Sequence, residues 1–179
     1  MPKQRFEQVH IQREGADAAE LSSFLKNWND PLTENEIKEA VERRNQMKIP
    51  ILDEAVSLWT FPQRDLPHSY IEFLQYSNGG EFQTGERYFQ LFSTSELREY
   101  NLLYEFPEYM KGSVSIGMDG CGNHYIVDMR EEPVNGEYPI RTAHSGCLDY
   151  EESVKVAESF EELCKGRSSM DDEKDRLWE

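Results

Sequence analysis

No hydrophobic run in the 179-residue chain approaches the roughly 20 apolar residues that a membrane-spanning helix needs, so we expect no membrane insertion. Cysteine is also scarce. The chain has only Cys121, Cys147 and Cys164, and so small and odd a number does not form the disulfide framework of a secreted domain. Residues 1–14 contain neither an apolar core nor a small-residue cleavage site. No signal peptide is therefore expected, and the protein is predicted to be cytoplasmic.

Positive charge is in short supply. The chain has 19 Lys and Arg residues against 35 Asp and Glu residues, which gives a formal net charge of −16. The basic residues form no run, and a phosphate backbone would need one, so nucleic acid is not an expected partner. A strongly acidic protein attracts basic partners, and its charge favours a soluble monomer. The alternative is that the acidic surface serves solubility alone, because net charge does not by itself identify a partner.

Capping signals and apolar spacing predict helices in the first part of the chain. The clearest case is a capping box in which Thr33 and Glu36 start a helix that runs to about Gln46. Pro67 suits the first turn of a later helix, and the Asn-Gly-Gly that follows suits a left-handed helix end. The helices expected from such signals cover residues 17–28, 34–46, 67–77 and 93–106, with Pro107 at the end of the last.

Strands dominate the second part of the chain. Two short strands joined at Thr84-Gly85 are expected within residues 80–92. Asn135-Gly136 is a strong hairpin signal between two later strands. Further strands are predicted over residues 114–118, 124–129, 138–143 and 154–157. A last helix is expected to start after Ser159 and to stop at Gly166.

This order of elements predicts an α+β fold: one domain with a mixed or antiparallel sheet covered by helices on one face. The predicted domain occupies residues 31–166. Residues 1–30 are expected to form an N-terminal extension with one short amphipathic helix. Residues 167–179 are expected to form a charged, mobile C-terminal tail.

Four segments resemble motifs of the SUKH superfamily. They read "LTENEI", "LPHSYIEFLQYSNGGEF", "SIGMDGCGNHYIVDM" and "AESFEELC", and together they extend from about Leu32 to Lys165. The residues that carry the resemblance are Leu66, Pro67, Phe73, Leu74, Asn78, Gly79, Gly80, Gly120, Gly122 and Phe160. The chain departs from the superfamily pattern in a long segment between Gln46 and Leu66 and in the extra helix at 17–28.

The resemblance implies an α+β fold with no catalytic residues, no cofactor and no metal. Members of the superfamily include fungal regulators of cell-wall glucan assembly and bacterial immunity proteins that neutralise polymorphic toxins. The resemblance therefore implies a non-catalytic protein-binding domain that neutralises a toxin domain, and the acidic charge of the chain favours a basic toxin domain. The alternative it leaves open is a regulatory scaffold for cell-wall or envelope assembly.

A metal site and a thiol enzyme are two further alternatives at the turn in "SIGMDGCGNHYIVDM". Cys121 and His124, with His144 and Cys147, have the ligand types and spacing of a zinc site, and a hairpin could bring them together. A slip of one residue in strand register would point a ligand to the wrong face, so zinc is not expected. A Cys–His nucleophile pair lacks an identifiable orienting residue.

The simplest interpretation of this turn is structural. Gly120 and Gly122 allow tight backbone angles, and Asp119 and Asn123 can cap the turn with their own side chains. Neighbouring acids such as Glu131 and Glu132, or Glu151 and Glu152, are interpreted as solvated surface.

Aromatic and acidic residues are the candidates for partner binding, because aromatic side chains and desolvated charges dominate protein interfaces. For each aromatic residue the competing interpretation is packing in the core. The candidates are Trp59, Glu81, Tyr88, Asp119 and Tyr125, together with Asn123, which lies beside Asp119 at the rim of the turn.

Overall fold

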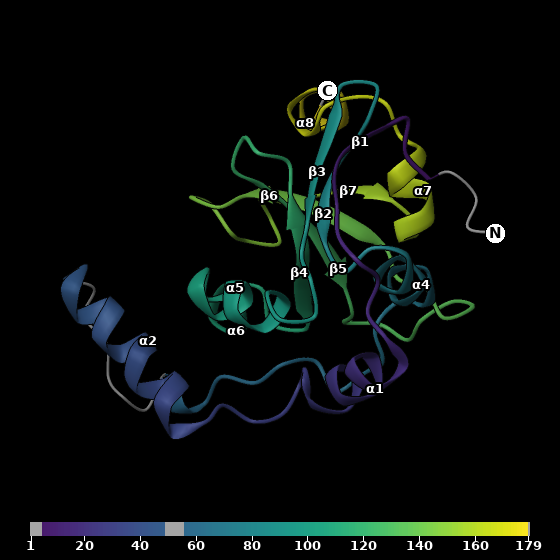
Figure 1. Cartoon of the computed structure of the whole chain (residues 1–179). Helices are drawn as coiled ribbons and strands as arrows, with labels where there is room; N and C mark the ends of the chain where they lie inside the picture. Colours follow the sequence, from purple (N-terminus) through teal and green to yellow (C-terminus); the bar gives the residue numbers. More distant parts are fainter. Residues whose placement is uncertain (1–4, 49–55, 179) are drawn as a thin grey trace.

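The strands of the protein form one antiparallel sheet whose order in space follows the order of the sequence. The computed structural model describes residues 5–48 and 56–178, and in them the sheet has seven strands (Figure 1). The strands are β1 (Gln8–Gln12), β2 (Gly80–Thr84), β3 (Arg87–Leu91), β4 (Ser113–Met118), β5 (Asn123–Asp128), β6 (Ile140–His144) and β7 (Val154–Ala157). The sheet confirms the antiparallel form of the predicted α+β fold.

The helices begin where the sequence carries caps. Both hydrogen bonds of the capping box are present at Thr33, and the side chains of Asp17 and Ser159 each accept a main-chain N–H three residues on. The helices are α1 (Ala18–Asn27), α2 (Glu34–Gln46), α4 (His68–Tyr76), α5 (Leu97–Leu103), α6 (Phe106–Tyr109), α7 (Phe160–Lys165) and α8 (Met170–Trp178). Local signals of this kind fix a helix start because they act within one turn.

The helix expected over 93–106 is divided. The chain leaves α5 at Leu103 and passes through Glu105, whose φ of 58° is left-handed, before α6 starts at Phe106. Pro107 lies in the first turn of α6 and does not end a helix, because a missing N–H has no cost at that position.

Helices cover both faces of the central part of the sheet. The sequence predicted helices on one face only. Figure 1 shows α4 and α7 on one side of the sheet and α5 and α6 on the other. Alternation along β5 explains the two layers: Tyr125 and Val127 join the large core, whereas Ile126 packs with Phe106 of α6 in a second cluster. The strand was expected, but its burial on both sides was not.

Phe73 of α4 lies at the centre of the large core. Its ring contacts those of Phe82 on β2 and Phe160 on α7, at centroid distances of 5.5 and 5.8 Å. The motif residues Leu66 and Leu74 are also buried. The motif that resembles the SUKH superfamily thus supplies the packing between α4, α7 and the sheet.

Residues 8–12 form an edge strand that the sequence analysis did not anticipate. The segment QVHIQ alternates polar and apolar residues as a strand does, but all five residues of β1 are exposed, so the alternation marks no buried face. Main-chain pairing with β2 holds it in place instead, with a bulge between Val9 and Ile11. The N-terminal extension therefore adds a strand to the sheet as well as the predicted helix α1.

Gly80 links α4 to this edge of the sheet. Its φ is +129°, and a Cβ atom built on it would lie 2.3 Å from the carbonyl oxygen of Ile11 in β1. We expect Gly80→Ala to lower the free energy of unfolding by about 1–3 kcal/mol, because alanine is strained at this φ and would push β1 away. Urea unfolding measures the loss. Alanine at exposed Gly146, whose φ is not left-handed, is the control, and equal stability of the two variants would contradict the prediction.

The C-terminal residues differ from the expected mobile tail, since residues 170–178 form α8. Met170 is buried, and Glu173 forms an ion pair with buried Arg87 of β3 at 2.8 Å. Arg87 also donates to the carbonyl oxygens of Leu163 and Ser168. The many charged residues of this segment suggested a solvated tail. One of them, Glu173, is instead the ion-pair partner of Arg87, whose guanidinium is buried beside the sheet.

Candidate protein-binding surface

The turn between β4 and β5 is held by its own side chains. One carboxylate oxygen of Asp119 accepts hydrogen bonds from the main-chain N–H groups of Cys121 (2.8 Å) and Asn123 (3.0 Å). The amide of Asn123 donates to the other oxygen at 2.8 Å. Gly120 and Gly122 have φ values of 80° and 93°. These contacts agree with the structural interpretation of the turn.

Asn123 also joins the turn to α8. Its amide nitrogen donates to Asp171 at 3.0 Å, and its amide oxygen accepts from Lys174 at 2.6 Å. Asp119 and Asn123 are buried by this arrangement. Neither side chain is available to a partner, so the prediction that Asp119 and Asn123 contact a partner is wrong.

The four residues of the zinc alternative do not converge. His144 of β6 pairs with Asn123 of β5, and His124 is the next residue of β5, so the side chains of the two histidines lie on opposite faces of the sheet. His144 is exposed, whereas His124 is fully buried. Within residues 5–48 and 56–178, no group of three or more His, Cys, Asp or Glu residues could hold a metal ion. In the same ranges no hydrogen bond joins a cysteine to a histidine, so the geometry offers no activated thiol either.

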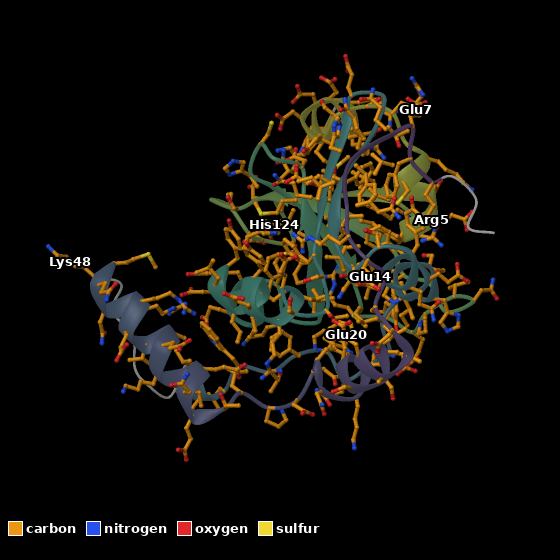
Figure 2. The ribbon with its side chains drawn as sticks, in the orientation of Figure 1. Arg5, Glu7, Glu14, Glu20, Lys48 and His124 are labelled. Atoms are coloured by element: carbon orange, nitrogen blue, oxygen red, sulfur yellow. The ribbon has the colours of Figure 1, made fainter. Side chains whose placement is uncertain are left out.

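His124 lies between the sheet and helices α5 and α6. Figure 2 shows it inside the molecule, whereas Lys48 stands at the far end of α2. Its Nδ1 is 2.8 Å from Ser115 Oγ, which donates to the Gly117 carbonyl. The ring proton therefore belongs to Nδ1, and Nε2 is buried without a hydrogen-bond partner among the described atoms.

The burial of this imidazole has an electrostatic cost. The rings of Tyr104 and Phe106 pack edge-on against it at centroid distances of 4.5 and 5.1 Å. Burial in these surroundings, together with the nearby His144, lowers the pKa of His124 to about 4. His124 is thus a neutral core residue at physiological pH.

Two aromatic candidates belong to the core and not to the surface. Trp59 is 3% exposed, and its Nε1 donates to Glu108 at 2.7 Å. Tyr125 is fully buried and stacks on Phe89 at a centroid distance of 5.1 Å. Core packing, the competing interpretation of these residues, is therefore the correct one. Neither side chain contacts solvent enough to bind a partner.

The other two candidates, Glu81 and Tyr88, lie side by side on an uncovered part of the sheet. We define the open sheet face as the outer side chains of β1, β2 and β3: His10, Glu81, Gln83, Tyr88 and Gln90. Glu81 pairs with Gln90 across the two strands, and Gln83 pairs with Tyr88. All four residues of β2 and β3 are partly exposed, because the helices on this side cover the later strands.

Hydrogen bonds order the open sheet face. The Tyr88 hydroxyl donates to the Glu81 carboxylate, and this bond raises the pKa of Tyr88 to about 12. The imidazole of His10 lies beside the Tyr88 ring at 5.4 Å and shares a hydrogen bond with Gln83 at 2.9 Å. A partner would meet a surface whose side chains are already positioned.

A hollow opens where this face meets α5. Its lining includes the apolar residues Leu91 and Met118 and the aromatic residues Tyr100 and Tyr104. We call it the tyrosine hollow, and its polar and aromatic lining consists of Arg13, Glu81, Gln90, Phe92, Glu96, Tyr100 and Tyr104. Neither tyrosine was among the candidates predicted from the sequence, although Tyr100 in α5 and Tyr104 at its C-cap are four residues apart and so lie on one face.

The fold and this surface define a class: an α+β domain with a meander sheet and an open, polar and aromatic sheet face. The family model described as the SMI1 / KNR4 family (SUKH-1) matches residues 31–166, and the chain belongs to this family. The resemblance to the SUKH superfamily is thereby confirmed. Members of the family are generally non-catalytic, and many bind protein partners. No curated protein matches the chain. In the part of the chain that the structure describes, no helix has the length and apolarity to cross a membrane.

Proposed function

We propose that the chain is a non-catalytic immunity protein that binds a toxin domain in a stoichiometric complex and blocks it. Family membership supports a binding role of the immunity or regulatory kind. The observation that carries the proposal is the open sheet face, which presents Glu81 and Tyr88 in fixed positions without a covering helix. We further propose that the protein is a monomer that acts in the cytoplasm, and that residues 31–166 are its SUKH-like domain.

The charge of the chain indicates the kind of toxin. A formal net charge of −16 gives the protein a negative field that attracts a positive surface. Enzymes that cleave nucleic acids carry such a surface, because they must bind phosphate backbones. A basic nuclease domain is therefore the partner that the electrostatics favour. The acidic protein would cover the positive substrate-binding surface.

Association with such a partner is expected to depend strongly on salt. We expect the association rate constant to fall by about tenfold or more when ionic strength rises from about 0.05 to about 0.5 M, because salt screens the attraction between exposed charges. The dissociation rate should change less. Stopped-flow or surface-based kinetics measure both rates. An association rate that is independent of ionic strength would contradict electrostatic steering.

Affinity capture from the native cells tests the proposed function. The tagged chain is used as bait at low and at high salt, and mass spectrometry identifies what is bound. Recovery of a basic toxin domain, together with rescue of growth when that toxin is expressed, supports the immunity role. A regulatory scaffold is the second candidate, since the family match supports it equally. Capture of envelope-synthesis enzymes without any rescue of growth would replace the immunity role with that one.

A further inference from the structure

We infer that the tyrosine hollow binds an arginine side chain presented by the protein partner. The inference rests on the proposed function, because it takes for granted that the chain binds a protein. It adds the place on the surface and the chemical group that is recognised there. Four observations support it: the charge of the hollow, its aromatic walls, its free carboxylate and a pattern that recurs elsewhere in the molecule.

The hollow has one uncompensated negative charge. Its ionic residues are the carboxylates of Glu81 and Glu96 and the guanidinium of Arg13. Arg13 donates to Glu96 at 2.9 Å, so those two charges compensate each other. Among the described residues no cation forms an ion pair with Glu81. Glu81 accepts the Tyr88 hydroxyl through one oxygen and keeps its other oxygen for a further donor.

The walls of the hollow suit a flat cation. Tyr100 and Tyr104 are both partly exposed, and Tyr100 is held by stacking on Phe92 at a centroid distance of 4.7 Å. The face of an aromatic ring attracts a cation, and a guanidinium plane stacks on it better than an ammonium group does. Gln90 supplies an amide oxygen at the same site, which can accept a further guanidinium N–H.

The protein binds its own arginine side chains in this way at three other places. In each of them a guanidinium pairs with a carboxylate and also lies over an aromatic ring. The three sets are Arg44 with Glu105 and Trp59 at 5.3 Å, Arg98 with Glu36 and Phe61 at 4.8 Å, and Arg130 with Asp128 and Tyr150 at 3.6 Å. The tyrosine hollow offers a carboxylate and tyrosine rings, and no arginine of the described chain pairs with its Glu81.

An amino-acid probe tests the inference directly. The probe is N-acetyl-arginine amide, and its control is N-acetyl-citrulline amide, which has nearly the same shape without the charge. Titration followed by NMR should give saturable shifts of the Met118 methyl and of the Tyr100 and Tyr104 rings. We expect the citrulline probe to bind about tenfold more weakly or worse, because the charge-assisted bonds to Glu81 are lost. Equal binding of both probes, or shifts only outside the hollow, would overturn the inference.

A matched pair of variants separates this inference from the proposed function. Glu81→Gln removes the free carboxylate, and Glu86→Gln removes an exposed charge at the neighbouring β2–β3 turn. Glu81→Gln should weaken binding of the arginine probe and of the captured partner by about tenfold, while Glu86→Gln should leave both within about twofold. Equal binding of the partner by wild type and both variants would overturn the inference and leave the proposed function standing. If the wild-type chain captures no partner, the proposed function fails and the probe titration alone decides what the hollow binds.

Discussion

Replacement of Glu173 by alanine is expected to lower the free energy of unfolding by about 3 kcal/mol. Glu173 is 7% exposed and Arg87 is 2% exposed, so the variant leaves a guanidinium in the interior without its carboxylate. Burial already lowers the pKa of Arg87, which shows the cost of its charge there. The expected loss is at the lower end of the range for broken buried pairs, because Arg87 keeps two main-chain carbonyl acceptors.

The control for this change lies two residues away on the same helix. Asp175 is exposed, and Asp175→Ala should alter the free energy of unfolding by less than about 0.5 kcal/mol. Urea unfolding followed by tryptophan fluorescence compares the two variants. If Glu173→Ala is as stable as Asp175→Ala, α8 is a solvated tail, as its composition suggested, and is not an anchored part of the fold.

The free energy of unfolding is expected to fall by about 3 kcal/mol between pH 7 and pH 4 because of His124 alone. The pKa of His124 is lowered to about 4 in the folded protein, against about 6.5 in the unfolded chain. The unfolded chain therefore takes up a proton that the folded protein does not bind. The contribution of His124 is fully present above pH 6.5 and is lost progressively as pH falls toward 4.

A variant without the imidazole isolates this effect. His124→Leu should be less dependent on pH between 6.5 and 4 than the wild type, whatever its absolute stability. His144→Gln is the control, because His144 is exposed and its removal should leave most of the pH dependence in place. Below about pH 4 the carboxyls whose pKa values are lowered, including Glu36 beside Arg98, add a further loss. A wild-type stability that is flat from pH 7 to pH 4.5 would contradict the burial of a neutral His124.

Local signals explain why much of the fold could be predicted. The caps at Asp17, Thr33 and Ser159 join residues three apart, so they can be recognised in the sequence alone. The same holds for the Asn135-Gly136 turn, where both residues have positive φ. These signals located most helices and strands, and the family motifs indicated the α+β fold, but neither indicated the break between α5 and α6 or the helices on both faces of the sheet.

Long-range contacts explain what could not be predicted. Strand β1 is held by main-chain bonds to β2, about 70 residues away, and α8 is held by an ion pair across 86 residues. The alternation in β1 covers only five residues in a polar segment, and the charged sequence of α8 does not reveal that Glu173 has a buried partner. The sequence therefore predicted only a helix in the N-terminal extension and a mobile tail at the C-terminus. The ends instead extend the sheet and cover the charge of Arg87.

The candidate surface was predicted only in part, for a similar reason. Glu81 and Tyr88 alternate with Phe82 and Phe89, so their outward direction follows from the pattern of the strands. Tyr125 is also an aromatic residue of a strand, but helices cover its strand, β5, on both sides. Residue type could not separate exposed from buried aromatics, because burial depends on which strands the helices cover.

We propose that the protein acts by forming a stoichiometric complex and not by catalysis. The most direct test of this proposal is a titration of the captured partner with the purified chain, followed by native mass spectrometry and by the partner's own activity. We predict a complex with one chain per partner, and an activity that falls in proportion to the chain added and reaches its floor at one equivalent. Full loss of activity at a small fraction of an equivalent, with covalent change of the partner and no complex, would show that the chain is an enzyme.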